Sequence, residues 1–508
     1  TDTKNEREII VREEILPEQI ITSKESTTKP KSELLWEASE GWAICKAVNI
    51  SDANHHSFVG WYVNYEAWAY FGETNIPIWV YDIVDIDYPS QDMTSDGMYM
   101  VGAAGNTIYE FEPSSGNPVW SYSIAVSETI YNIVISDNGN TIFYVSGDAF
   151  DHMNITSLDI ATSSENWSYE LPESGYVWGF TLSKNAERLV ILQYSWVTVY
   201  SNDGIVLFQI NPDTGSQTPP AISDDGSIFV IGDLHGYMNV YEYNVHTSTY
   251  EHKWEYLFEW GAYYDWVSAL AISGDGSTIA GGSLQFEGGG SYSGELALFN
   301  FESNIPLWVY LCTDDKIADI DMSEDGSVIA AASWGPLGDE NNDFWIFYKT
   351  SDIPVFEYNC VGSTIALDLS SDGIRCIAGG KAVHCRVMGH GGKLYYFEVT
   401  PIIGIEDEEN NIYNNYVLLQ NYPNPFSTST TISFSATDLH RLTQIKIYNI
   451  KGQLVKQLFP ISIGINSQLS IDWDGKDENG KQLSNGIYFY SLKIGDRIID
   501  TKKCVILR

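Results

Sequence analysis

The chain has 508 residues, of which 44% are hydrophobic and 14% aromatic, a composition too apolar for a disordered chain and rich in residues that favour strands. Its 68 Asp and Glu against 27 Lys and Arg give a formal net charge of −41, and such a field repels nucleic acid and anionic lipid surfaces. No apolar run approaches the ~18 residues that span a bilayer. Composition therefore predicts a folded all-β protein, with no nucleic acid partner and no membrane span.

Residues 1–33 are rich in charge and carry no repeat signature, so we expect an extended leader. The chain begins at Thr1 rather than Met, which we interpret as a mature end from which an export signal has been removed. Two β-prone runs, residues 7–14 and 18–23, are long enough to add to the edge of a sheet in a neighbouring molecule. A head-to-tail contact of this kind builds a filament when the rotation does not close, so the leader suggests a homopolymer.

From residue 34 onward the chain repeats one pattern, shown best by IADIDMSEDGSVIAAAS at residues 317–333. An alternating run, a Ser-x-Asp-Gly turn and a second apolar run predict a β-hairpin. The turn recurs at intervals of 40 to 50 residues, the period of a four-stranded propeller blade. Its hydroxyl residues are Ser51, Thr94, Ser136, Ser183, Ser223, Ser273, Ser323 and Ser370.

An aromatic anchor accompanies each repeat, at Trp36, Trp79, Trp120, Trp167, Phe208, Trp254, Trp308 and Phe356. Eight anchors and eight turns predict an eight-bladed β-propeller over residues 34–400, with seven blades as the alternative. The first anchor lies in an extra strand that precedes the first complete repeat, whereas the last repeat, which contains the turn at Ser370, lacks a fourth strand. We therefore expect residues 34–38 to pair with residues 393–399 and close the ring without exposed edges.

The segments FEPSSGNPVWSYS and FESNIPLWVY, around Trp120 and Trp308, resemble the quinoprotein-type propeller repeat, and the Ser-x-Asp-Gly hairpins resemble the WD40 and YVTN groups. This resemblance covers residues 34–400 and implies the fold rather than an activity, because propellers host many functions. A quinoprotein dehydrogenase would be expected to carry a vicinal Cys pair, and the sequence has no Cys-Cys. The repeat is better interpreted as architecture, with a degenerate quinoprotein as the least favoured alternative.

Residues 401–416, PIIGIEDEENNIYNNY, break the pattern and are interpreted as a linker. Residues 417–508 then show short alternating strands separated by Gly and Asn turns, a pattern that predicts an Ig-like β-sandwich.

The order of motifs in this second domain closely resembles the C-terminal sorting domain of cargo for the type IX secretion system of Bacteroidetes. The residues that carry the resemblance are Asn421, Tyr422, Pro423, Asn424, Pro425, Phe426, Trp473, Gly475, Gly486 and Tyr488. The sequence departs from the family at Ser427-Thr428, where Asn-Pro is frequent. The resemblance implies the type IX machinery as a partner and a location outside the cell or on the outer-membrane surface of a Gram-negative bacterium.

One cofactor is considered, calcium, because Asp472, Asp474 and Asp477 cluster hard oxygen ligands in this domain. Turn chemistry explains the same residues, and the segment lacks a full EF-hand loop, so the calcium site is the less favoured interpretation.

Cys376, His384, Cys385 and His390 lie close in sequence, but their spacing matches no zinc pattern. A disulfide between Cys376 and Cys385, or two unrelated thiols, is the preferred interpretation.

Two groups of aromatic residues could stack on sugars: Trp61, Tyr62 and Trp68, and Tyr263, Tyr264 and Trp266. Packing between blades explains them as well and is preferred. Neither G-x-S-x-G nor H-E-x-x-H occurs, so we assign no catalytic residue.

These observations favour a secreted, non-enzymatic propeller that acts as an extracellular structural or protein-interaction module, displayed or self-assembled at the cell surface. The alternative is a propeller that binds or cleaves carbohydrate, with a glycan in place of a protein partner. A structural module should show no cleft with convergent carboxylates, whereas an enzyme should show strongly perturbed pKa values in the central funnel.

Overall fold

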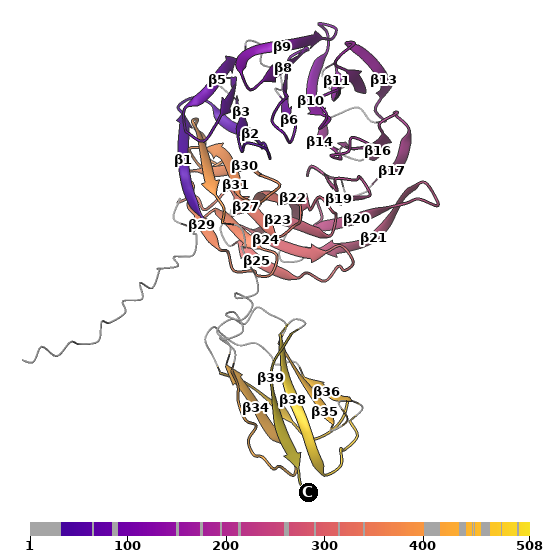
Figure 1. The fold of residues 1–508 in the computed structure, drawn as a ribbon, viewed down its shortest axis with the longest axis vertical. Helices are drawn as coiled ribbons and strands as arrows, with labels where there is room; N and C mark the ends of the chain where they lie inside the picture. The colour runs from indigo at the N-terminus through magenta and orange to yellow at the C-terminus, as the bar shows by residue number, and fades with distance from the viewer. Residues whose placement is uncertain are drawn as a thin grey trace, which may run out of the picture.

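The computed structural model describes residues 32–62, 66–83, 90–148, 152–172, 176–193, 196–211, 215–258, 264–288, 291–312, 315–338, 341–400, 417–435, 443–449, 451, 453–458, 468–478, 480–494 and 497–508. All regular structure in these ranges is β-strand, arranged in ten sheets (Figure 1). The strands predicted in the leader lie outside the described residues, as does the linker. No helix in the described part of the chain is long and apolar enough to cross a membrane.

Eight four-stranded antiparallel sheets form the blades of a propeller, which confirms eight blades and excludes the alternative of seven (Figure 1). Blades 1 to 4 are, from the axis outward, β2 (Ile44–Ile50), β3 (Ser57–Tyr62), β4 (Ala67–Phe71) and β5 (Pro77–Asp82); β6 (Ser90–Met93), β7 (Met100–Ala104), β8 (Thr107–Glu112) and β9 (Ser115–Ser123); β10 (Thr129–Ile135), β11 (Thr141–Gly147), β12 (Met153–Asp159) and β13 (Ser164–Glu170); β14 (Val177–Leu182), β15 (Arg188–Gln193), β16 (Val197–Ser201) and β17 (Val206–Ile210).

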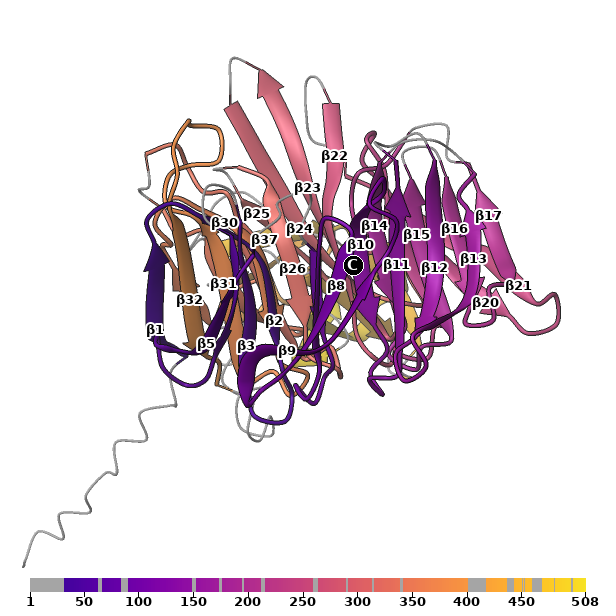
Figure 2. The same cartoon turned by 90° about the horizontal axis from the view of Figure 1, so that it is seen from above.

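Blades 5 to 8 are, in the same order, β18 (Ala221–Ile222), β19 (Ile228–Gly232), β20 (Tyr237–Asn244) and β21 (Thr249–Leu257); β22 (Tyr264–Ile272), β23 (Thr278–Gly288), β24 (Ser291–Asn300) and β25 (Trp308–Cys312); β26 (Ile317–Met322), β27 (Val328–Ser333), β28 (Phe344–Tyr348) and β29 (Phe356–Tyr358); β30 (Ser363–Leu369), β31 (Arg375–Lys381), β32 (Gly392–Glu398) and β1 (Glu33–Glu40). Strands β22, β23 and β24 project beyond the neighbouring blades (Figure 2).

The repeated hydroxyl builds the turn between the first two strands of a blade. Ser323 Oγ donates to Asp325 Oδ1 at 2.7 Å and accepts from the Val328 backbone N–H at 3.0 Å. Gly326 has a φ of 65°, which glycine adopts without steric cost. All eight predicted hydroxyl residues are buried. Each hydroxyl therefore lies inside the turn at the end of its hairpin.

The ring closes as predicted, since β1 pairs antiparallel with β32. Trp36 lies opposite Tyr396, and Ala38 lies opposite Leu394. The Trp36 indole also stacks on Phe71 of blade 1, with ring centroids 5.5 Å apart. The two ends of the propeller sequence therefore meet within blade 8, and the first anchor links that blade to blade 1.

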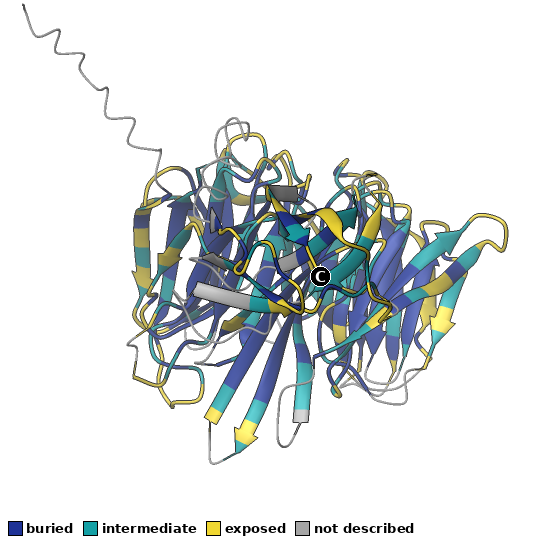
Figure 3. Cartoon of the chain, turned by 90° about the horizontal axis from the view of Figure 1, so that it is seen from below, coloured by how far each residue is buried: buried dark blue, intermediate teal, exposed yellow. Residues whose placement is uncertain are grey.

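The eight aromatic anchors all lie on the outermost strand of their blades, as the sequence predicts. Four of them donate an indole N–H to the loop between the third and fourth strands of the next blade. The pairs are Trp120 to Ser163 Oγ (3.1 Å), Trp167 to Asn202 O (2.6 Å), Trp254 to Phe301 O (2.6 Å) and Trp308 to Lys349 O (2.9 Å). Buried residues fill the blades behind these contacts, while the loops at both faces are exposed (Figure 3).

The C-terminal domain is a sandwich of two sheets (Figure 1). One sheet contains β33 (Val417–Leu418), β34 (Thr430–Ser435) and β37 (Gln468–Trp473), and the other contains β36 (Leu454–Leu458), β35 (Thr443–Asn449), β38 (Gly486–Ile494) and β39 (Arg497–Ile506). Trp473 and Tyr488, two of the sorting-motif residues, belong to its core. Tyr448 is only half-buried, because the alternate residues Ile445 and Ile447 of β35 face the core instead.

Candidate functional site

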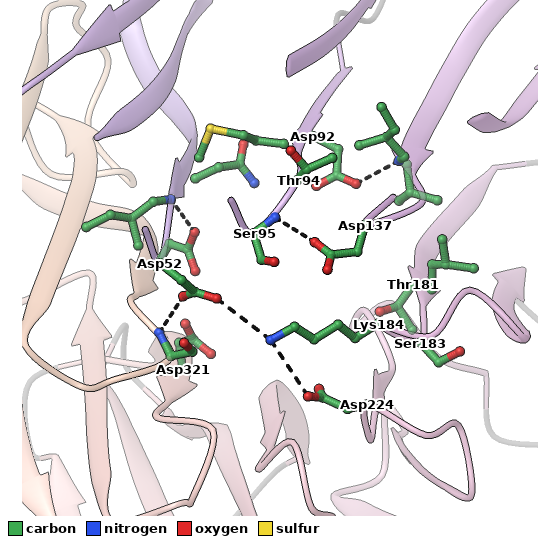
Figure 4. A pocket seen from close by; sticks show the side chains of 18 of the residues that line it. Asp52, Asp92, Thr94, Ser95, Asp137, Thr181, Ser183, Lys184, Asp224 and Asp321 are labelled. Atoms are coloured by element: carbon green, nitrogen blue, oxygen red, sulfur yellow. Dashed lines mark hydrogen bonds and ion pairs between the residues drawn. The ribbon is translucent and has the colours of Figure 1, made fainter. Parts of the chain in front are cut away.

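A cavity of about 570 Å³ lies at the axis of the propeller, where the first strands and the Ser-type turns of the blades converge (Figure 4). The turn residue directly after each hydroxyl surrounds the mouth of this channel. In blade order these residues are Asp52, Ser95, Asp137, Lys184, Asp224, Gly274, Glu324 and Ser371. Four carboxylates and one ammonium group therefore gather at one end of the axis.

Hydrogen bonds run between successive blades around this mouth. The Asp224 N–H donates to Gly274 O at 3.0 Å, the Gly274 N–H to Glu324 O at 2.9 Å and the Glu324 N–H to Ser371 O at 2.8 Å. Asp52 Oδ1 in turn accepts from the Ser371 N–H at 2.8 Å. A Cβ on Gly274 would lie 2.7 Å from Asp224 Oδ2, so a larger residue there would displace the Asp224 side chain.

Lys184 extends from blade 4 across the mouth toward Asp52 of blade 1 and Asp224 of blade 5 (Figure 4), and it also lies near Glu324 of blade 7. Its Nζ lies 3.7 Å from Asp52 Oδ2, 3.9 Å from Asp224 Oδ2 and 3.8 Å from Glu324 Oε2. Burial lowers the pKa of Lys184, but the surrounding carboxylates outweigh it and hold the pKa above its usual value. The pKa of Asp224 is raised, first by burial and then by Glu324 and Asp52, with Lys184 opposing.

On the first strands of blades 2, 7 and 8, four half-buried carboxylates bond to the first strand of the next blade. Each accepts a backbone N–H of the following blade: Asp92 from Ile135 (2.9 Å), Asp319 from Leu367 (2.9 Å), Asp321 from Leu369 (2.7 Å) and Asp368 from Ile50 (2.6 Å). Desolvation raises the pKa of Asp92 and of Asp319 to about 7, although the donated N–H groups lower it. The channel thus gathers carboxylates with perturbed pKa values, which is the arrangement expected of an enzyme rather than of a purely structural module. Each of these four carboxylates, however, already bridges two blades.

No site prediction included these channel residues, although the sequence carries a signal for them. The alternating run before Ser323 places Asp319 and Asp321 on the face away from the blade core. When the eight repeats are aligned on their hydroxyls, Lys184 and the mouth carboxylates share the position after the hydroxyl, and Asp92, Asp321 and Asp368 share the position two residues before it.

A second, shallower depression of about 590 Å³ adjoins the mouth and is lined mainly by carboxylates of blades 5 to 8. Four of these belong to the turns themselves: Asp225, Asp275, Asp325 and Asp372. Burial raises the pKa of each, but hydrogen bonds within the turn outweigh it and leave the pKa below its usual value. These carboxylates keep their charge and make the mouth face strongly acidic.

The first group of candidate sugar-stacking residues is internal. Trp61, Tyr62 and Trp68 are 6%, 5% and 0% exposed, and the Trp68 indole N–H donates to Tyr62 Oη at 3.0 Å. They pack within and between blades. In the second group Trp266 is half-buried, while Tyr263 and the side chain of Tyr264 lie outside the described residues.

The predicted disulfide between Cys376 and Cys385 is wrong, because the structure places the two residues apart and joins neither in a disulfide. Cys376 lies opposite Leu369 in the hairpin of blade 8. The Cys385 N–H donates to Ser363 Oγ at the other end of that hairpin, six residues along β30. At about 3.3 Å per residue this separation is roughly 20 Å, well beyond the reach of a disulfide.

The two histidines near these cysteines bind different loops. His384 Nε2 lies 2.9 Å from Gly335 O, and His390 Nδ1 lies 2.8 Å from Gly41 O. Among the residues that the structure describes, no group of three or more His, Cys, Asp or Glu is arranged to hold a metal ion.

The three candidate calcium ligands each have a partner of their own. The contacts are Asp472 Oδ1 with Thr431 Oγ1 (2.6 Å), Asp474 Oδ2 with Lys476 Nζ (2.7 Å) and Asp477 Oδ1 with the Lys481 N–H (2.8 Å). The Asp477 contact matches the turn chemistry expected of the segment, whereas Asp472 bonds across two strands and Asp474 forms an ion pair. The calcium site stays a prediction.

The sorting-motif residues hold one end of the sandwich together. Asn421 is 2% exposed, and its Nδ2 donates to Thr430 Oγ1 at 2.8 Å. Asn424 Oδ1 accepts from the Val505 N–H at 2.9 Å, and Phe426 packs edge-on against Trp473. A Cβ on Gly475, at a φ of 68°, would lie 2.7 Å from an Arg508 Nη2. The motif therefore couples the start of the domain to its last strand.

Comparison with known families identifies the second domain. Residues 420–507 match the family described as "Secretion system C-terminal sorting domain", which confirms the type IX assignment. This domain directs the chain to an extracellular or cell-surface location. No curated protein shows significant similarity to the chain. Among solved structures, the β-propeller domain of Cps50 (Swd1) from Myceliophteria thermophila aligns at a TM-score of 0.46 and 9% identity, covering 73% of this chain and all of that domain.

Proposed function

We propose that this chain, in which a type IX sorting domain follows an eight-bladed propeller, works outside the cell as a non-enzymatic structural and protein-interaction module. The observation that carries the proposal is that the same chain combines an export domain with a channel whose carboxylates are used to join blades. Asp92, Asp319, Asp321 and Asp368 each accept a backbone N–H from the next blade. A catalytic carboxylate would instead present its oxygens to a substrate.

The interaction role follows from the construction of the ring. Its blades are held at the axis by hydrogen bonds between the first turns and at the rim by indole N–H groups that donate to the loops between third and fourth strands. The loops between second and third strands take no part in these contacts and can vary without loss of the fold. A rigid scaffold with variable loops suits display and protein binding.

Self-assembly through residues 1–33 is the more specific part of the proposal. Ser32, near the end of the leader, is 4% exposed, and its Oγ accepts from the Thr400 N–H at 3.1 Å. The leader is therefore attached where blade 8 closes the ring. The outermost strands of the blades supply edges to which it could add, and β13 is exposed at six of its seven residues.

Two experiments separate the parts of this proposal. A periplasmic reporter joined to residues 417–508 should cross the outer membrane of a type IX-competent host, and a reporter with the Asn421→Ala change should cross less efficiently.

Light scattering should show polymers of the full-length protein but not of a version beginning at Lys31. If both versions stay monomeric at high concentration, or both polymerise equally, the leader has no role in assembly, whatever the export result.

A further inference from the structure

One loop between a second and a third strand, residues 382–391 of blade 8, is fastened to two other blades. It lies on the face of the propeller opposite to the mouth, because it follows the end of β31 that is remote from the Ser-type turn. Strands β23 and β24 of blade 6 project on the same face, where they form the projecting hairpin, residues 284–296 (Figure 2). Arg386, in the middle of the loop, contacts both this hairpin and the segment that leads into blade 7.

Arg386 forms a two-point ion pair with Asp315, which lies two residues before β26 of blade 7. Its Nε donates to Asp315 Oδ2 at 2.9 Å, and its Nη2 donates to Asp315 Oδ1 at 2.8 Å. The Asp315 side chain is only 3% exposed, so salt and solvent screen this pair much less than a surface pair. A planar guanidinium matches both carboxylate oxygens at once, which the ammonium group of a lysine does not.

The same guanidinium lies over an aromatic ring of the projecting hairpin. Arg386 Cζ is 3.3 Å from the ring centroid of Tyr292 on β24, and 5.1 Å from that of Trp334, which follows β27 of blade 7. A cation within about 6 Å of a ring centroid is attracted by the electrons of the ring face. Tyr292 in turn packs on Phe286 of β23, with ring centroids 5.1 Å apart. Through Tyr292, Arg386 therefore acts on both strands of the hairpin.

The rest of the loop holds its backbone in place around Arg386. His384, which is 6% exposed, accepts the Arg386 backbone N–H on Nδ1 at 3.1 Å. Its Nε2 must then carry the ring proton, which it donates to Gly335 O of blade 7 at 2.9 Å. On the other side, Lys381, which is 8% exposed, donates to Val387 O at 2.6 Å. These bonds fix the chain on both sides of Arg386, so its side chain is pre-organised for its two contacts.

We propose that Arg386 is a clamp that joins blades 6, 7 and 8 and fixes the projecting hairpin in one orientation. Strand ends that extend beyond the body of a domain open more easily than its interior, and the register of this hairpin shifts between Phe286 and Gly288. A contact with a fixed part of the ring therefore determines whether the hairpin keeps one position. The clamp supplies that contact from blade 8 and makes the hairpin a fixed arm on the face opposite to the mouth.

Hydrogen–deuterium exchange of the full-length protein tests the clamp. In Arg386→Gln the backbone amides of the projecting hairpin should exchange about tenfold faster than in wild type, as expected for loss of a partly buried cation–π contact. Arg386→Lys should recover only part of the protection, because an ammonium keeps the charge but not the two-point bond. Arg375→Gln is the matched control, since Arg375 of the same blade bonds one carboxylate, Glu398, at 2.9 Å but lies at the mouth end of β31. It should leave exchange of the hairpin unchanged.

Asp315→Asn distinguishes a clamp from a general loss of stability. It removes the carboxylate that orients Arg386 and should speed exchange of the same amides. Because the two residues act through one contact, the double variant should exchange no faster than the faster single variant. Unchanged protection of the hairpin in Arg386→Gln, an equal effect of Arg375→Gln, or effects of Asp315→Asn and Arg386→Gln that multiply would each overturn the proposal. None of these results bears on export by the sorting domain or on the leader.

Discussion

The indole of Trp36 stacks on the ring of Tyr396 with centroids 4.9 Å apart and planes inclined by 4°. This contact joins the first and last strands of the propeller in one blade, because Trp36 lies on β1 and Tyr396 on β32. The same indole packs on Phe71, so a single side chain secures both the inside of blade 8 and its junction with blade 1. The aromatic contacts of Trp36 therefore reinforce the closure that the pairing of β1 with β32 provides.

We expect Trp36→Ala to destabilise the propeller by about 3–5 kcal/mol, the usual cost of truncating a buried Trp, since Trp36 is 8% exposed. Urea unfolding of the full-length protein measures the loss. Trp42→Ala, at a position 62% exposed, is the control and should change little. Deleting residues 34–38 should go further and cause aggregation through the exposed edge of β32; unchanged solubility would contradict the closure.

Replacing Lys184 with Ala should destabilise the protein by about 1 kcal/mol at neutral pH, because three carboxylates lose their shared counter-charge. The loss should shrink in acid, as Asp224, whose pKa is raised, becomes protonated. It should also shrink at high salt. Lys253→Ala, which removes a lysine paired with Glu242 at the rim, is the control. A loss independent of pH and salt would show that Lys184 acts through packing alone.

The sorting domain should depend on Asn421 for its fold. Asn421→Ala removes the donor to Thr430 Oγ1 from a side chain that is 2% exposed, at a cost of about 1–3 kcal/mol. Thermal unfolding of the full chain should show a lower transition for this domain, with the propeller transition unchanged. Asn485→Ala, at an exposed position, is the control. Equal transitions in both variants would argue that the motif serves recognition rather than stability.

Loss of Cys385 should leave stability nearly unchanged. Cys385→Ser should alter the free energy of unfolding by no more than about 0.5 kcal/mol, whereas breaking a native disulfide typically costs about 2–5 kcal/mol. Alkylation of the unfolded, unreduced protein followed by mass spectrometry should modify all six cysteines. Protection of Cys376 and Cys385 from the reagent would contradict the placement of these thiols.

The number of blades, the strand that closes the ring and the identity of the second domain could all be predicted from the sequence. Each depends on contacts within short stretches of sequence. Ser323, Asp325 and Gly326 build a turn within one hairpin, and Asn421 binds Thr430 a few residues away. Because the local pattern occurs once in each blade, eight hydroxyls and eight anchors predict eight blades.

The channel could not be predicted in the same way, because it exists only where eight distant turns converge. In the sequence Lys184 is one residue of a hairpin turn, and only closure of the ring brings it within 4 Å of carboxylates from blades 1, 5 and 7. The hydrogen bond from the Leu369 N–H to Asp321 arises in the same way, from two blades placed side by side around the axis. Conversely, Cys376 and Cys385 are close in sequence, but the rigid extension of β31 carries them to opposite ends of one hairpin. Local hydrogen bonding determines the structure of each blade, whereas the geometry of the closed ring determines which charges meet at the axis.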